Sequence, residues 1–246
     1  MANSQSQPVN PAEALERLGR LSLRQHSMES LLRSVVDLTK TVMPGDTEAS
    51  ITLLVKDRPA TVVHTGQLAL DLDETQYERG HGPCLHAART VELTEITDTR
   101  TDSRWPDYMH RAAEHGNLSS LSVPLAIDED EQVTGALNIY ARHPHAFDED
   151  SRTAATGFAP YAAVAAGNMH AYQSAQNTAN HLQAGLKSRA IIDQAKGILM
   201  ERYKWTANQA FHVLTRASMK TNTKVRHVAD HVVRTGELPL RWTGRT

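Results

Sequence analysis

Side chains that can bind phosphates and bases recur through the last part of the chain, from residue 186 onward. Lysine and arginine neutralise phosphates, asparagine hydrogen-bonds to base edges, and small or flexible side chains leave room for an unstacked base. At about 100° per residue, most of these residues fall on helix faces that point away from an apolar stripe. The candidate contacts are Arg189, Lys196, Gly197, Met200, Arg202, Arg216, Lys220, Asn222 and Lys224. Their types and spacing predict a nucleic-acid-binding surface.

Gly197 is the least expected residue of this surface. A glycine in the middle of an exposed helix costs about 0.8–1 kcal/mol relative to alanine, so its presence indicates that a ligand approaches the backbone there. A solvated face with one tolerated glycine is the other interpretation, and both stay open. Arg202 differs from the rest of the set, because it lies at the edge of the apolar stripe.

A second group, His81, Cys84 and His86, lies close together in sequence and could bind a metal or haem. Such a site needs a fourth ligand and a supporting shell, and the sequence offers neither. We therefore expect no metal site, and we expect Cys84 to be a small buried residue at the start of a short helix.

No arrangement of residues indicates catalysis. The chain shows no Ser/His/Asp pattern, no glycine-rich phosphate loop and no paired carboxylates above background. Thiol reductase chemistry needs a second cysteine to resolve the first, and Cys84 is the single cysteine of the chain. We expect a protein that is not an enzyme, with a redox or metal-dependent enzyme as an alternative.

Charge divides the chain into two parts. Residues 1–185 carry 14 Lys and Arg against 24 Asp and Glu, a formal charge of −10, whereas residues 186–246 carry 12 against 4, a formal charge of +8. A compact basic module joined to an acidic body indicates a nucleic-acid-binding end governed by a larger part. Charge alone does not distinguish RNA from DNA.

The chain has the size and composition of a cytoplasmic protein. Its 246 residues, 40% of them hydrophobic, can form one or two domains. No apolar run is long enough for a membrane span, and Met1–Asn10 lacks the layout of a signal peptide. We expect no membrane partner.

Helices and antiparallel strands alternate in the acidic part. A polar lead and a helix are expected over residues 1–26, and Ser27 is expected to be the N-cap of the next helix. Strands are expected over Ile51–Val55, Thr61–His64, Val91–Thr94, Ser119–Ile127 and Val133–Ala141, with a helix over Trp105–His115. The first two strands form a hairpin through Asp57–Pro59. This order predicts an α+β domain with helices covering an antiparallel sheet.

Residues 148–185 are rich in Ala, Gln and Asn and predict a connecting helix. A weak seam for pairing two such helices recurs at heptad spacing over Phe158, Ala162, Ala165, Met169 and Tyr172. Gln176 and Gln183 interrupt it, and Pro160 is expected to kink the helix or restart it.

Three short helices are expected over Leu186–Thr235. The first has an apolar stripe around Ala195 and Leu199. Thr206 and Gln209 form a capping box for the second, whose buried face is predicted to be Ala210, Phe211, Leu214 and Ala217. Gly236 ends the third.

The run Ser188 to Arg202, with Ala195-Lys196-Gly197-Ile198-Leu199-Met200 at its centre, resembles the ANTAR family of RNA-binding antiterminator domains. Ala210-Phe211, Thr221-Asn222 and Val228-Ala229 extend the similarity. The resemblance implies a domain that works as a homodimer and binds RNA with two small stem-loops, which it stabilises against a competing terminator hairpin.

Upstream, Tyr77 to Cys84, Arg104-Trp105-Pro106 and Gly135 to Tyr140 are similar to GAF sensor domains. The resemblance implies a GAF-like antiparallel sheet with flanking helices, then a connecting helix and an all-α three-helix bundle. Because GAF domains commonly hold a small ligand between sheet and loops, His81, Cys84 and His86 become candidate ligand-binding residues. The ligand is unknown, and no other cofactor is implied.

These observations predict an RNA-binding transcription antitermination regulator. Its domains are 1–26, a disordered lead and helix; 27–147, the GAF-like sensor; 148–185, a connecting and dimerising helix; and 186–246, the ANTAR domain with a short tail. Its partners are RNA stem-loops, a second copy of itself, and a small-molecule effector or an upstream regulatory protein. A ligand-responsive DNA-binding regulator is the remaining alternative.

Overall fold

The computed structural model describes Glu13, Ala14, Glu16 and residues 27–239, which divide into two compact units, Met1–Tyr172 and Gln173–Thr246. Most of the predicted lead and helix over 1–26, and the tail beyond residue 239, lie outside the described residues.

A five-stranded antiparallel sheet forms the centre of unit one, as predicted. Its spatial order is β2-β1-β5-β4-β3, with bounds β1 Thr47–Val55, β2 Arg58–His64, β3 Thr94–Ile96, β4 Ser119–Asp128 and β5 Val133–Ala141. The β1–β2 turn is shorter than expected, because Lys56 and Asp57 both have positive φ (49° and 61°) and Arg58 is already paired. Two such residues suit the tight hairpin turns that match strand twist.

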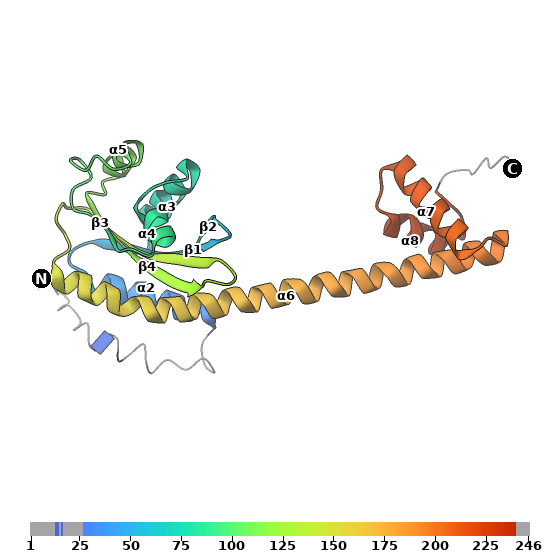
Figure 1. Ribbon diagram of the computed structural model, residues 1–246, viewed down its shortest axis with the longest axis horizontal. Coiled ribbons are helices and arrows are strands. Elements are labelled where there is room, and N and C mark those ends of the chain that lie inside the picture. Colours follow the sequence, from blue (N-terminus) through green and yellow to red (C-terminus); the bar gives the residue numbers. More distant parts are fainter. Residues whose placement is uncertain (1–12, 15, 17–26, 240–246) are drawn as a thin grey trace, which may run out of the picture. The chain divides into compact units, whose positions relative to one another are not determined.

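Helices cover both faces of this sheet (Figure 1). Helix α2 and the first part of α6 lie on one face, and α3 and α4 lie on the other, with α5 packed against α3. The bounds are α2 Met28–Val42, α3 Gln67–Arg79, α4 Pro83–Thr90, α5 Pro106–Glu114 and α6 Glu149–Tyr203. Ser27 caps α2 as predicted, with its side chain accepting from the Ser30 N–H.

Two local predictions fail. The strand expected over Val91–Thr94 begins only at Thr94, because Val91 closes α4 in the left-handed region (φ 58°). Helix α3 was not recognised, since the buried side of α3 includes Asp73 and Gln76 beside Leu72 and therefore shows no apolar period.

Helix α6 is one helix of 55 residues. Asp148 caps its start by accepting from the Ser151 N–H at 2.9 Å. The restart expected at Pro160 does not occur, because the helix continues through it. The helix also runs past residue 185, so the first of the three short helices predicted from Leu186 is the end of α6.

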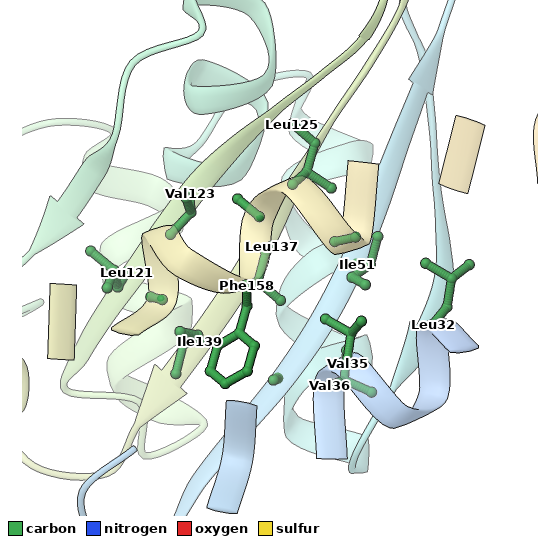
Figure 2. Close-up of a cluster of buried hydrophobic side chains, with 14 of the residues drawn as sticks. Leu32, Val35, Val36, Ile51, Leu121, Val123, Leu125, Leu137, Ile139 and Phe158 are labelled. Atoms are coloured by element: carbon green, nitrogen blue, oxygen red, sulfur yellow. The ribbon is translucent and has the colours of Figure 1, made fainter. Parts of the chain in front are cut away.

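The predicted pairing seam of α6 is wrong for most of its members. Phe158, Ala162 and Ala165 are buried in the apolar core of unit one, against the sheet of the same chain. Figure 2 shows Phe158 beside α2 residues and strand residues of this core. The apolar period of this stretch therefore reports burial on the sheet.

Unit two is a three-helix bundle, as predicted, made by the end of α6 with α7 (Ala207–Thr221) and α8 (Val225–Thr235). The capping box of Thr206 and Gln209 is present, and Gly236 ends α8 with φ 73°. The buried core consists of Ala195, Leu199, Ala210, Leu214, Ala217, Val228, Ala229 and Val232. Phe211, predicted to be buried, is 41% exposed.

Candidate nucleic-acid interface and sensor site

The last turns of α6 present an open surface in unit two. Arg189, Gly197 and Met200 are exposed, and Lys196 forms an ion pair of 2.9 Å with Asp193. A Cβ added at Gly197 would meet nothing within 4 Å. Packing inside the described chain therefore does not require a glycine here.

Arg202 has a structural contact that the sequence did not indicate. Its guanidinium donates to the carbonyl of Gly236 at 2.6 Å and lies 5.9 Å from the centre of the Tyr203 ring. Gly236 closes α8, so this bond joins the end of α6 to the end of α8.

The turn between α7 and α8 places two lysines around a capping residue. Asn222 adopts the left-handed conformation (φ 51°) and donates its N–H to the Ser218 carbonyl, which ends α7. Lys220 and Lys224 are exposed on either side of it, and Arg216 is exposed one turn before Lys220. Asn222 is therefore the C-cap of α7.

One aromatic pair near this surface was missed from sequence. Tyr203 and Trp205 stack with ring centres 4.5 Å apart and planes at 19°. The pair joins the end of α6 to the start of α7, and two aromatic residues two positions apart give no helical period that would reveal it.

In unit one, the two faces of the sheet differ in chemistry. On the face covered by α3 and α4, Ser50 of β1 and Ser122 of β4 both pair in register with Asn138 of β5, and Thr52 and Tyr140 lie two positions along. All five side chains are buried. This face carries a polar layer inside unit one.

Asp73 of α3 lies at the centre of that layer. Its carboxylate accepts hydrogen bonds from the Tyr140 hydroxyl at 2.6 Å, the Thr61 hydroxyl at 2.8 Å and the Asn138 amide at 3.3 Å. Burial nevertheless raises the pKa of Asp73 from 3.8 to about 6, against the lowering effect of these bonds. The pKa of this carboxyl group therefore lies close to neutral pH.

Asn138 connects this carboxylate to Cys84. Its amide nitrogen lies 3.1–3.3 Å from acceptors on Ser50, Thr52, Asp73 and Cys84, although its two hydrogens can serve only some of them at once. Burial, followed by the charge of Asp73, raises the pKa of the Cys84 thiol. The thiol is therefore held in its protonated and less nucleophilic form.

The three candidate ligand residues do not converge. Cys84 is fully buried at the start of α4, as predicted, whereas His86 is exposed and its ring contacts Trp105 at 5.4 Å between centres. The Nδ1 atom of His81 is buried without a hydrogen-bond partner. Within the described ranges, no three His, Cys, Asp or Glu side chains are grouped as a metal ion would require.

Gly82, which precedes Cys84, is required by its backbone. It adopts φ 148°, and a Cβ there would collide with the side chain of Gln76. The Gln76 amide oxygen accepts from the Cys84 N–H at 2.8 Å and so satisfies the first turn of α4.

Seven further polar side-chain atoms of unit one are buried without a hydrogen-bond partner in the described structure. Four of them are the hydroxyls of Tyr108, Ser120 and Ser122 and the amide oxygen of Asn138. Three of these residues belong to β4 and β5, on the same face as the polar layer. Sequence reasoning missed this cluster. The one available signal was that polar residues such as Ser120 and Ser122 alternate with apolar residues along a strand.

The fold and these sites define a two-part protein, with an α+β unit that has a buried polar layer and a helical unit that has a basic surface. The GAF domain model matches residues 25–166, and the ANTAR domain model matches residues 180–233. The chain therefore belongs to the GAF domain family and carries a C-terminal ANTAR domain, as its motifs indicated. ANTAR domains are known for RNA binding in antitermination and GAF domains for sensing, so the architecture is that of a regulatory protein.

Solved structures with the same fold as unit one come from proteins of different function. The reduced form of fRMsr of Staphylococcus aureus is 16% identical, with a TM-score of 0.50, and covers 67% of this chain and 99% of its own. The phycoerythrobilin-bound GAF domain of a cyanobacterial phytochrome is 14% identical, with the same TM-score, and covers 67% of this chain and 97% of its own. At these identities the likeness shows the fold.

No curated protein matches the chain. Among the helices formed by the described residues, none has the length and apolar character needed to cross a membrane.

Proposed function

We propose that the chain is an RNA-binding transcription antitermination regulator. A homodimer binds an RNA with two stem-loops and prevents formation of a terminator hairpin, under control of the GAF unit. The observation that carries this proposal is the ANTAR match over residues 180–233, on a unit whose exposed face gathers the cations of a phosphate-binding surface. The formal charge of +8 over residues 186–246 supports a polyanionic partner.

The proposed RNA contacts occupy two places on unit two. Exposed Gly197 and Met200 form a surface on which an unstacked base can lie, and the cations Arg189 and Lys196 belong to the same part of α6. Around the α7–α8 turn, Arg216, Lys220, Asn222 and Lys224 contact phosphates and base edges.

We assign Arg202 a positioning role, because its guanidinium already binds the end of α8. Arg202→Ala should lower the free energy of unfolding of unit two by about 1 kcal/mol. Lys204→Ala is the control, since Lys204 forms only an exposed ion pair with Glu201 and should change stability by less than about 0.5 kcal/mol. Loss of RNA affinity in Arg202→Ala with unchanged stability would instead make it a direct contact.

For the sensor we propose a small-molecule effector that binds at the polar layer of unit one. The unpartnered hydroxyls of Tyr108, Ser120 and Ser122 support a ligand that hydrogen-bonds to this face. These groups, and the carboxyl of Asp73, replace the outward-facing His86 as the centre of the proposed site. In this proposal, His81 and Cys84 lie at the border of the ligand site.

The test of the function is to isolate the full chain from cells with its bound RNA and to sequence that RNA. Paired short stem-loops ahead of genes are the expected enrichment. A gel shift then compares one such RNA with duplex DNA of the same sequence, and preference for the RNA is expected. Preference for the DNA, or RNA with no common hairpin, would overturn the proposal, and a coloured or metal-containing purified protein would favour a redox or metal-dependent role.

A further inference from the structure

Asp73 is a buried acid whose hydrogen bonds all come from uncharged groups. Its carboxyl is fully buried and accepts from Tyr140, Thr61 and Asn138. Within the part of the chain that the structure describes, no Lys, Arg or His side chain forms an ion pair with it. Buried carboxylates are usually paired with a cation, because taking an uncompensated charge out of water costs free energy. The described residues do not supply a cation for this one.

The basic side chains on the neighbouring elements have other contacts. Arg89 of α4 forms its ion pair with Asp57 at 2.9 Å. His64 of β2 has its Nδ1 atom 3.1 Å from the carbonyl oxygen of Gly66, and it affects Asp73 through its charge, which lowers the pKa of the acid. The carboxyl group therefore remains open to a cation from outside the chain.

The polar groups around Asp73 also have more acceptors than donors. The Asn138 amide nitrogen has two hydrogens for four neighbouring acceptors, whereas its amide oxygen is buried without a partner in the described structure. The hydroxyls of Ser122 and Tyr108 are unpartnered in the same way. Ser122 lies in register beside Asn138, and Tyr108 packs in one cluster with Tyr140. A ligand that satisfies this layer therefore brings hydrogen-bond donors.

These two properties select one class of ligand. An anion would place a second negative charge beside Asp73, and no Lys or Arg is found among the buried residues of the described chain to offset it. A neutral acceptor would leave the Asn138 oxygen without a hydrogen bond. A protonated amine supplies both the positive charge and the N–H donors, and its hydrogen bonds to a carboxylate are strong.

We propose that the effector of unit one is a small protonated amine, whose ammonium group binds the Asp73 carboxylate and donates to the Asn138 amide oxygen and the Ser122 hydroxyl. This inference rests on the proposed effector site and adds the chemical class of its ligand. Asp73 belongs to α3, whereas Asn138 and Ser122 belong to the sheet below it (Figure 1). A bound amine therefore joins the covering helix to β4 and β5.

Competition with a proton gives this binding a pH dependence. Burial raises the pKa of Asp73 to about 6, and the amine binds the ionised form. The affinity should fall about tenfold per pH unit below about pH 6 and change little above about pH 7. The other titratable groups of the layer have pKa values raised mainly by burial and stay protonated over this range; they are Tyr77 of α3, Cys84 of α4, Tyr108 of α5 and Tyr140 of β5.

Calorimetric titration of the full chain at neutral pH tests the class of ligand without any RNA. The probes are alkylammonium chlorides from methylammonium to butylammonium. Tetramethylammonium chloride is the control that has the charge but no N–H, and sodium acetate is the control anion, all at one ionic strength. Saturable binding of at least one alkylammonium ion, and of neither control, is the expected result.

Asp73→Asn tests the place of binding, because it removes the charge and keeps the shape of the carboxyl group. It should weaken binding of the tightest alkylammonium probe at least about tenfold and abolish the pH dependence. Asp71→Asn is the matched control, since Asp71 lies on the same helix, is 35% exposed and accepts from Gln67. That variant should bind as the unmodified chain does. His64→Gln should keep the fall in affinity below about pH 6.

The outcomes separate this inference from the proposed function. It is wrong if no alkylammonium ion binds with a dissociation constant below about 10 mM, or if tetramethylammonium binds equally well. Binding of acetate instead would reverse the class of ligand and keep the effector site. Equal affinities of Asp73→Asn and Asp71→Asn would place the amine outside the polar layer, and a flat pH profile in His64→Gln would contradict proton competition at Asp73. Absence of RNA binding by the unmodified chain would overturn the antitermination function alone.

Discussion

The two faces of the sheet in unit one use the same strands for opposite purposes. On one face, Ile51, Leu137 and Val123 lie in register beside each other and pack with α2 and α6. One position along the same strands, Ser50, Asn138 and Ser122 lie in register on the face below α3 and α4. Because side chains of a strand alternate between faces, a single set of strands carries both an apolar layer and a polar layer.

The difference shows that the apolar face of the sheet stabilises the sensor unit and that the polar face makes it less stable. Burying apolar side chains stabilises the fold, whereas burying hydroxyls, an amide and a carboxyl costs free energy unless each group is hydrogen-bonded. The polar layer contains groups that are not hydrogen-bonded within the described structure, such as the hydroxyls of Ser120 and Ser122. A protein that keeps such groups inside has given up stability there, which is the pattern expected of a binding site.

The largest effect is expected on the apolar face. Phe158→Ala removes a fully buried ring from the core shown in Figure 2 and should lower the free energy of unfolding of unit one by about 3–5 kcal/mol. Tyr161→Ala, one turn further along α6, is the control, because Tyr161 is 40% exposed. Urea denaturation followed by circular dichroism measures both, and equal losses would show that the apolar face does not dominate stability.

A smaller effect with a clear sign is expected on the polar face. The pKa of Asp73 is raised by burial from 3.8 to about 6, so between these values the folded protein binds more protons than the unfolded chain. Stability from this group is complete below about pH 4 and is lost as the pH rises through about 6, a change of about 3 kcal/mol.

Asp73→Asn tests this pH dependence, since asparagine resembles the protonated acid in shape. The difference in unfolding free energy between the variant and the unmodified protein should grow in favour of the variant from pH 4 to pH 7. A constant difference over that range would mean that Asp73 has an ordinary pKa and that its hydrogen bonds outweigh the cost of burial.

Sequence reasoning succeeded where local chemistry decides the structure. The Thr206–Gln209 capping box, the glycine that ends α8 and the strands β4 and β5 were all predicted, because each depends on neighbouring residues alone. The domain architecture followed from motifs such as the run around Gly197, which the ANTAR match covers.

Sequence reasoning failed where distant parts of the chain decide which residues are buried. The period of Phe158, Ala162 and Ala165 correctly marks a buried side of α6 but does not say what buries it, and the sheet does so instead of a second helix. Asp73 and Gln76 occupy the buried side of α3, so this helix lacks the apolar period by which helices are recognised. The polar layer is visible only once the strands are in register.

The roles of the proposed contact residues, and the domain limits at residues 147 and 185, stay predictions. Spacing places the cations on exposed faces, but it carries no information on which of them meets RNA. Arg202 shows the difficulty, since this exposed arginine at the edge of the apolar stripe binds the carbonyl of Gly236.

The smallest effect distinguishes bonded from unbonded polar groups within the same layer. Ser122→Ala removes a buried hydroxyl that has no partner, so it should raise the free energy of unfolding by about 1 kcal/mol. Ser50→Ala is the matched control, because the Ser50 hydroxyl accepts from the Asn138 amide at 3.2 Å and its loss should lower stability by a similar amount. Thermal unfolding of both variants beside the unmodified protein measures the two signs. If Ser122→Ala is destabilising as well, its hydroxyl has a partner in solution, such as a bound water or the effector itself. Burying the polar layer would then cost less free energy of folding than its unpartnered groups indicate.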